Sequence, residues 1–142
     1  MPQNPQWLLF ALLSALAAAA TAILTKLGVE GVPSTMATAL RTVVVAAIAW
    51  SIAFGLGEHR ALATVSRRSL IFLGLSGVAT GVSWLCYFRA LQLAPASRVA
   101  PVDKLSLPLT IALAALVLGE AVGWKLALGV LLMTVGALLT VS

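Results

Sequence analysis

The stretch WLLFALLSALAAAATAILT, residues 7–25, decides the class of fold, because it holds nineteen consecutive residues without a charge. As a helix it would rise about 28 Å, close to the ~30 Å thickness of the hydrocarbon core of a bilayer. Four more apolar stretches follow, so hydropathy predicts transmembrane helices at about 7–27, 34–56, 70–91, 96–118 and 123–141. We expect an all-α integral membrane protein with five such helices in a single domain, residues 1–142.

The composition excludes a soluble globular domain. Of the 142 residues, 61% are hydrophobic and 9% are charged, whereas soluble domains have about 45–50% apolar and about 25% charged residues. So few polar side chains cannot cover a water-facing surface. The apolar runs are too long for the alternating strands of a membrane barrel, and helices satisfy their own backbone polar groups in lipid. Only short connections remain, which leaves no room for a soluble catalytic domain.

Reactive side chains are too few for a catalytic or metal site. Cys86 is the single cysteine and His59 the single histidine, so neither a disulfide within the chain nor a metal site of these ligands is expected. No paired carboxylates and no Ser, His and Asp arrangement fall at membrane depth. The net charge is +5, but the nine Lys and Arg residues are scattered, which argues against a nucleic-acid surface. We therefore expect no enzyme activity, cofactor, metal or nucleic-acid partner.

The first stretch has an alternative interpretation as a cleaved signal peptide, because alanines 17–20 follow an apolar core. Two observations favour a retained helix. Residues 1–6 carry no Lys or Arg, and the apolar run continues past the alanines to Lys26. We predict that this segment forms the first membrane helix.

Basic residues in the connections show little preference for one orientation in the membrane. If the side of the N-terminus is called near and the other side far, the two sides carry similar numbers of basic residues. The four near-side residues are Arg60, Arg67, Arg68 and Lys125, and the three far-side residues are Lys26, Arg89 and Arg98. Insertion in both orientations is therefore open, although the three arginines of the second connection favour a cytoplasmic near side.

Three charged residues stand out because they lie deep inside the predicted membrane helices rather than near an end: Arg41, Asp103 and Lys104. A charge at the bilayer centre costs at least about 2.5–3.5 kcal/mol on insertion scales, so such residues usually serve a function. Helices that enter from the far side at Pro33 and Pro95 place Arg41 and Asp103 both about 12 Å deep, near the midplane where transporters bind substrate. The alternative is structural: an Arg41–Asp103 ion pair fastens two helices while Lys104 snorkels outward.

A proline and two aromatic residues mark the surroundings of this layer. Pro108 lacks the N–H that would bond to the carbonyl of Lys104, which either frees that carbonyl for a ligand or leaves a mere kink. On the third stretch, Trp84 and Tyr87 share a face by their i, i+3 spacing. We expect them to wall the binding layer, and an interfacial aromatic belt combined with packing is the alternative.

The fifth stretch places Gly129 and Gly136 seven residues apart, so both lie on one face of a helix. Glycines with this spacing open a groove that admits another helix closely. We expect this face to pack against a second chain.

The order of these features resembles the EamA domain of the drug/metabolite transporter superfamily over nearly all 142 residues. The resemblance rests on Trp7, Lys26, Arg41 and the run from Trp84 to Trp124, which includes YFRALQLAPASRVAPVDKLSLPLTIALAALVLGE at residues 87–120. Members usually carry two five-helix repeats in inverted orientation and export amino acids or other small metabolites. The resemblance implies one half of a ten-helix inverted-repeat transporter, a multi-pass protein of the inner, cytoplasmic cell membrane.

A single repeat needs an inverted twin, because alternating access rocks one repeat against the other. Two separate chains are inverted only if they insert in opposite orientations, which the balance of basic residues permits. We therefore expect an antiparallel homodimer with dual topology. Its Gly129 and Gly136 resemble the seven-residue glycine spacing of the dimer helix in the related small multidrug transporters.

These observations predict an exporter or exchanger of small metabolites with a carboxylate, such as amino acids. The first stretch lacks the acid with which small multidrug exporters exchange protons for cations, and Arg41 and Lys104 outnumber Asp103 in the embedded layer. Arg41 or Lys104 would bind the carboxylate of the substrate. Asp103 would either offset the positive charge of these two residues or bind an amine of the substrate. Trp84 and Tyr87 would close the pocket. The competing interpretation is a non-transporting membrane subunit or assembly partner whose buried ion pair is structural.

Overall fold

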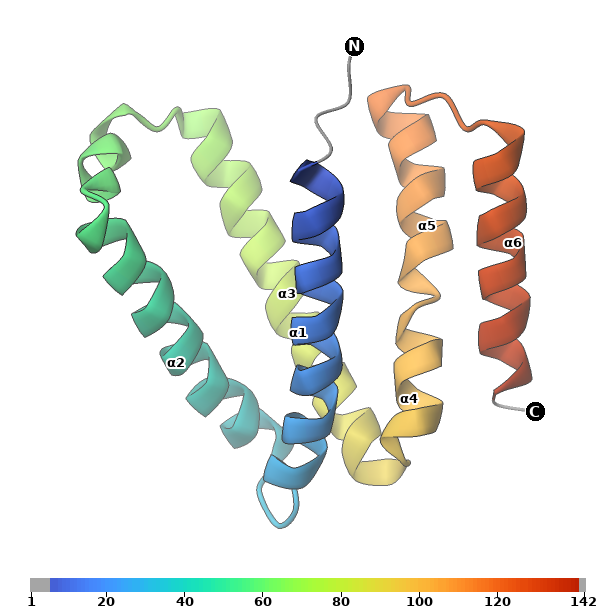
Figure 1. The fold of residues 1–142 in the computed structure, drawn as a ribbon. Coiled ribbons are helices and arrows are strands. Elements are labelled where there is room, and N and C mark those ends of the chain that lie inside the picture. The colour runs from blue at the N-terminus through green and yellow to red at the C-terminus, as the bar shows by residue number, and fades with distance from the viewer. Residues whose placement is uncertain (1–5, 141–142) are drawn as a thin grey trace. The chain divides into compact units, whose positions relative to one another are not determined.

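The computed structural model describes residues 6–140, and over that range the chain forms helices joined by short turns (Figure 1). In chain order the elements are α1 (Gln6–Gly28), α2 (Ser34–Gly55), the 3₁₀ helix η1 (Glu58–Thr64), α3 (Arg67–Leu93), α4 (Ala96–Asp103), α5 (Ser106–Leu113), the π-helix η2 (Ala114–Leu118) and α6 (Trp124–Leu139). The described residues therefore have the all-α fold that the sequence predicts.

Four segments are long and apolar enough to cross a bilayer: Gln6–Gly28, Ser34–Gly55, Arg67–Leu93 and Ala96–Leu118. α6 is also apolar but has 16 residues, which rise about 24 Å, less than the ~30 Å hydrocarbon core. Residues 6–140 thus contain four candidate membrane spans and one shorter apolar helix. A fifth crossing stays a prediction, and residue 141 at its expected end lies outside the described range.

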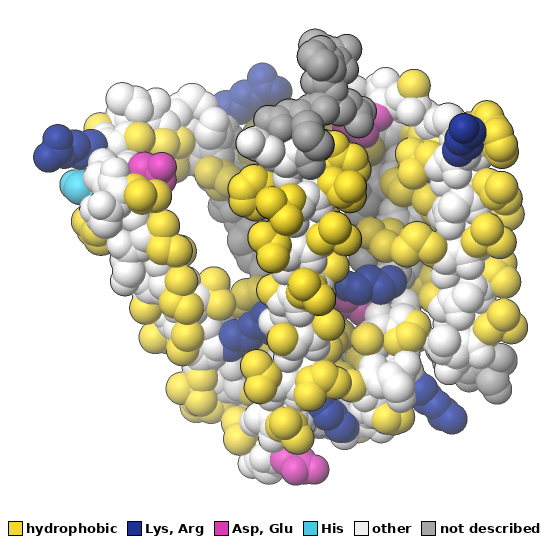
Figure 2. Space-filling model, in the orientation of Figure 1, with side chains coloured by type: hydrophobic (Ala, Val, Ile, Leu, Met, Phe, Trp, Pro, Cys, Tyr) yellow, Lys and Arg dark blue, Asp and Glu magenta, His cyan; other side chains and the backbone are white. Residues whose placement is uncertain are grey.

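Large apolar side chains face outward along these helices. Leu16 and Leu24 of α1, for example, are 69% and 67% exposed. In Figure 2, hydrophobic side chains cover much of the visible helix faces, and most charged side chains lie near helix ends. Helix surfaces of this kind would associate in water but are stable in contact with lipid chains.

The chain divides into two compact units, and each is described by itself. One unit comprises residues 25–92, with the end of α1, then α2, η1 and α3. Within it, α2 and α3 diverge toward η1 (Figure 1). The other unit comprises residues 6–24 together with the chain from residue 93 onward. In that unit α6 packs against α4 and α5.

The fourth apolar stretch differs from the single helix 96–118 that the sequence predicts, because a turn separates α4 from α5. Pro108 explains the break, since it has no N–H to donate to the carbonyl of Lys104. That carbonyl accepts the N–H of Leu107 at 3.0 Å instead. The local winding is tighter and the Lys104 carbonyl has a donor, as in the second of the two outcomes considered, a kink rather than a carbonyl free for a ligand.

Prolines also leave carbonyls without helical donors at the ends of α1 and α3. Pro33 stands four residues after Val29, and Pro95 stands four residues after Leu91. In a continued helix the N–H groups at positions 33 and 95 would bond to those two carbonyls, but proline has none. In a lipid environment an unsatisfied carbonyl costs several kcal/mol, so other donors are needed.

The Val32 N–H donates to the Val29 carbonyl at 3.4 Å, and two side chains supply further donors across the two helix ends. The Lys26 ammonium donates to the Leu91 carbonyl at 2.5 Å. The Gln92 amide donates to the carbonyls of Val29 at 3.3 Å and Val32 at 2.6 Å. We call this pair of contacts the Lys26–Gln92 clasp. It holds the end of α1 and the connection to α2 against the end of α3.

Arg89 fixes the orientation of the clasp amide. Its Nη1 donates to the Gln92 side-chain oxygen at 3.1 Å, so the amide nitrogen of Gln92 is directed to the two carbonyls. Around the clasp, Val29 and Leu91 are 3% and 0% exposed. Apolar burial and complete hydrogen bonding therefore coincide at this end of the unit.

The clasp predicts a loss of stability when its cationic donor is removed. Lys26→Met should lower the free energy of unfolding by about 1–3 kcal/mol, because the Leu91 carbonyl loses a charged donor and Pro95 cannot replace it. Chemical unfolding in detergent micelles, followed by circular dichroism, measures the change. Lys26→Arg is the matched control because it keeps a cationic donor. Equal stability of Lys26→Met and the unmodified protein would contradict the clasp.

Candidate functional site

Arg41 of α2 lies against two aromatic rings of α3. Its guanidinium carbon Cζ is 4.3 Å from the ring centroid of Trp84 and 5.5 Å from that of Phe88. Both distances fall within the ~6 Å range of cation–π attraction. Arg41 and Trp84 are half-buried, and Phe88 is buried at 1% exposure. The charge thus rests on an aromatic wall inside a segment long enough to span the membrane.

Helix geometry explains why these residues meet. Trp84 and Phe88 are four residues apart and therefore share one face of α3. Arg41 is seven residues from the start of α2 and Trp84 nine residues from the end of α3, or about 10 and 14 Å along each helix. The clasp holds those two helix ends together. Residues at similar distances along α2 and α3 from these joined ends therefore come into contact.

Hydroxyl groups close to Arg41 are already hydrogen-bonded within α2. Thr38, one turn before Arg41, is 7% exposed, and its Oγ1 donates to the Ser34 carbonyl at 2.8 Å. The Oγ1 of Thr42 donates to the Thr38 carbonyl at 2.8 Å. These threonines satisfy their donors locally, as hydroxyls in membrane helices commonly do, so they leave Arg41 as the main polar group of the site.

The guanidinium of Arg41 keeps its hydrogen-bonding capacity. Among the described residues of its unit, the contacts of this group are the two aromatic rings, and no acceptor takes one of its hydrogen bonds. A guanidinium has five N–H donors in a planar fork that matches a carboxylate in two parallel bonds. Because this half-buried guanidinium has donors to spare, the arrangement is chemically suited to bind a planar anion.

Asp103 and Lys104 lie in the other unit, at the break between α4 and α5. The Lys104 ammonium is 3.4 Å from Asp103 Oδ2, and the side chains of Lys104 and Asp103 are 55% and 38% exposed. Neighbouring residues in an exposed pair of this kind bind each other weakly. Arg41 and Asp103 belong to different units, so the pairing of these two residues stays a prediction.

Phe88 joins Trp84 at Arg41, and the sequence had not singled out Phe88. The rings of Trp84 and Phe88 both lie within cation–π distance of Arg41, and the role expected for Tyr87 stays a prediction. Tyr87 is half-buried on α3. The i, i+4 spacing of Trp84 and Phe88 could have identified this pair. Gln92 was also missed, and its position at the end of an apolar helix next to a proline was the available signal.

The α6 face with Gly129 and Gly136 is exposed. No atom of the described residues outside the local helix backbone comes within 4 Å of the place where a Cβ would stand on either glycine. Among residues 6–140, no group of three or more His, Cys, Asp or Glu residues could hold a metal ion.

Comparisons with known proteins agree with the resemblance seen in the sequence. Residues 5–142 match the model of the EamA-like transporter family. The chain is also 45% identical over 136 residues to a protein of a Sinorhizobium species named "Uncharacterized transporter in cobO 3′ region", and the match covers 96% of each chain. The search of solved structures found no significant match. These matches confirm the family that the sequence analysis identified.

The contact between Arg41 and Trp84 predicts an energetic coupling in a double-mutant cycle. Whatever the effect of Arg41→Met or Trp84→Leu alone, the double variant should be more stable than additivity predicts by about 0.5–2 kcal/mol, because either single change already removes the contact. Chemical unfolding in detergent micelles measures the coupling. A cycle of Arg41→Met with Trp50→Leu is the control, and we expect it to be additive. Additive behaviour in both cycles would show that the Trp84 contact contributes nothing.

Proposed function

Because the chain belongs to the EamA-like transporter family, we propose that it moves small metabolites with a carboxylate, such as amino acids, across the membrane. The family and the transporter-named relative make it a multi-pass membrane transporter rather than an enzyme. The observation that carries the choice of substrate is Arg41, a cation held on aromatic rings within an apolar helix and available to an anion.

In this proposal Arg41 binds the substrate carboxylate through two parallel hydrogen bonds. The rings of Trp84 and Phe88 support one side of the guanidinium and offer an apolar surface to the substrate side chain. A low-dielectric site strengthens the contact between the two charges. The same site disfavours a cationic drug, because a cation would meet the positive charge of Arg41 without a partner.

Asp103, Lys104 and Tyr87 have supporting roles in the proposal. Lys104 offers a second cation to the carboxylate, and Asp103 balances the layer or receives the amine of an amino acid. Both stand at the break in the fourth stretch, a kind of discontinuity at which transporter helices often bind substrate. Tyr87, half-buried on α3, closes the pocket together with Trp84.

We further propose that the transporter works by alternating access as an antiparallel homodimer in the inner membrane and exports its substrate. The match with the Sinorhizobium relative covers 96% of both chains, so that relative has about the same length. Two chains of this size in opposite orientations would supply the inverted pair that alternating access uses. The exposed Gly129 and Gly136 of α6 would allow the two chains to approach closely.

Arg41→Ala should reduce efflux of radiolabelled amino acids from proteoliposomes at least about tenfold, because the carboxylate loses a charge-assisted partner of about 1.5–3 kcal/mol. Arg41→Lys should retain partial activity, since it keeps the charge and loses the fork. The control is Arg98→Gln, which changes an exposed arginine of α4. Efflux by Arg41→Ala at the rate of the unmodified protein would remove Arg41 from the site and leave the transport function standing.

The antiparallel dimer predicts two topologies for one sequence. Fusions of the C-terminus to paired reporters, one active in the cytoplasm and one active outside it, should both be active. A single Lys added near Arg60 should shift the ratio of the two orientations toward the one with the segment between α2 and α3 in the cytoplasm. The reason is that the basic residues on the two sides are otherwise balanced. Activity of one reporter alone would overturn the antiparallel arrangement and leave a parallel oligomer or an unlike partner.

A further inference from the structure

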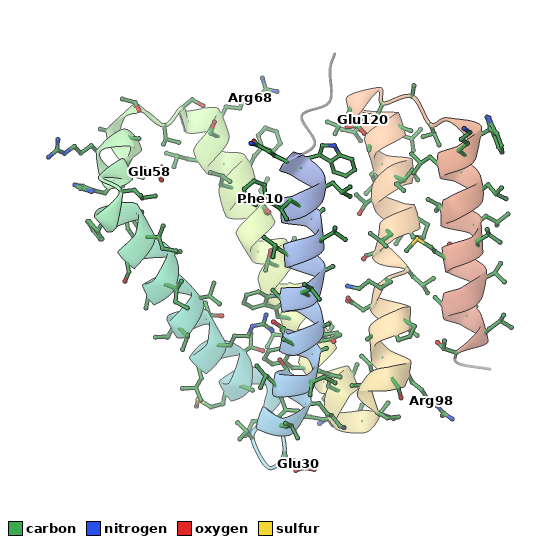
Figure 3. All side chains as sticks on the ribbon, in the orientation of Figure 1. Phe10, Glu30, Glu58, Arg68, Arg98 and Glu120 are labelled. Carbon is green, nitrogen blue, oxygen red and sulfur yellow. The ribbon has the colours of Figure 1, made fainter. Side chains whose placement is uncertain are left out.

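The segment between α2 and α3 carries three arginines that the transport site does not use. Arg60, Arg67 and Arg68 are exposed, and Glu58 is the acidic residue among them. The segment joins two candidate membrane spans, so it lies where the hydrocarbon core meets the headgroups. Figure 3 shows Glu58 and Arg68 at this end of the unit of residues 25–92, and Glu30 at its other end.

Local structure holds this segment in a defined shape. Gly57 adopts φ 72°, a left-handed conformation that suits glycine, and begins η1. At the other end, Ser66 Oγ accepts the N–H of Ser69 at 3.1 Å, which caps the start of α3. This cap places Arg67 and Arg68 in the first turn of α3, where a positive side chain opposes the helix dipole. These arginines therefore do not stabilise the helix that carries them.

The positive charges of the segment have no counterions within the described part of this unit. No carboxylate there lies within ion-pair distance of Arg60, Arg67 or Arg68. Arg68 has its guanidinium carbon 5.8 Å from the ring centroid of Phe72, one turn further along α3. This position follows the way in which arginine lays its stem on an apolar membrane helix and keeps its charge at the interface.

Apolar side chains accompany the arginines. Leu56 and Leu62 are 68% and 57% exposed on either side of Arg60. A surface that combines exposed leucines with unpaired arginines matches the boundary layer of a bilayer, where acyl chains and charged headgroups are both in reach. A soluble acidic partner would leave these leucines in water.

We propose that Arg60, Arg67 and Arg68 form a binding surface for the headgroups of anionic phospholipids. Arginine binds phosphate oxygens through its planar fork, and basic residues next to membrane spans are attracted to anionic lipid. The surface is independent of Arg41 and of the transported substrate. It would hold the η1 end of α2 and α3, where these helices diverge (Figure 1), against the headgroup layer.

The test measures which lipid lies next to the segment. Ala63→Cys in a Cys86→Ala background places one fluorophore on η1, and the protein is reconstituted in phosphatidylcholine vesicles that contain brominated phosphatidylglycerol or brominated phosphatidylcholine. Quenching should show a severalfold preference for phosphatidylglycerol, with up to about a fivefold contribution from each arginine. Replacing all three arginines with Gln should bring the preference close to one. Arg98→Gln, outside the segment, should leave it unchanged.

Two further measurements test whether the preference is electrostatic and whether the ligand is a lipid headgroup or a free phosphate. In 1 M salt the preference of the unmodified protein should fall, because the screening length drops to about 3 Å; this arm needs no variant. Added glycerol phosphate at millimolar concentration should not compete with the lipid. Equal quenching by both lipids, an unchanged preference in the triple variant, or full competition by glycerol phosphate would each overturn the lipid-binding surface.

Discussion

The hydrogen bond from Lys26 to the Leu91 carbonyl, together with the bonds from Gln92, holds the unit of residues 25–92 in place. Lipid provides no donor for a carbonyl that proline has left unpaired, so the protein must provide one. Pro95 creates this need at the Leu91 carbonyl, to which Lys26 donates. At the Val29 carbonyl, opposite Pro33, the Gln92 amide donates in addition to the Val32 N–H. The contacts of the Lys26–Gln92 clasp therefore both complete the hydrogen bonding at the helix ends and attach these ends to each other.

The position of Arg41 follows from that attachment. Because the start of α2 and the end of α3 are held together, residues at similar distances from these two ends lie side by side. Arg41 therefore contacts Trp84 and Phe88. The rings make the charge tolerable without consuming its hydrogen bonds, since cation–π attraction acts through the ring face. An Arg paired with a carboxylate would be stable but would have less capacity for a substrate. In the function that we propose, the aromatic wall is the feature that suits Arg41 to an exchangeable anion.

The fourth apolar stretch meets the same proline problem in another way. Near Pro108 the backbone itself provides the donor, because it winds more tightly and the Leu107 N–H bonds to the Lys104 carbonyl. The result is a break between two short helices, with Asp103 and Lys104 beside it. A clasp joins two segments, whereas a break within one segment introduces a point at which the helix direction can change. Within one short chain, proline therefore serves both attachment and discontinuity.

The sequence alone determined the class of fold, because an uncharged run as long as residues 7–25 matches the thickness of a bilayer. It also determined the family, since the order of Trp7, Lys26, Arg41 and residues 84–124 extends over the chain. Only the tertiary structure decided that Phe88 lies against Arg41 and that Lys26 bonds to the Leu91 carbonyl. Periodicity gives the spacing of residues on one helix, but the rotation of that helix depends on contacts with residues more than sixty positions away.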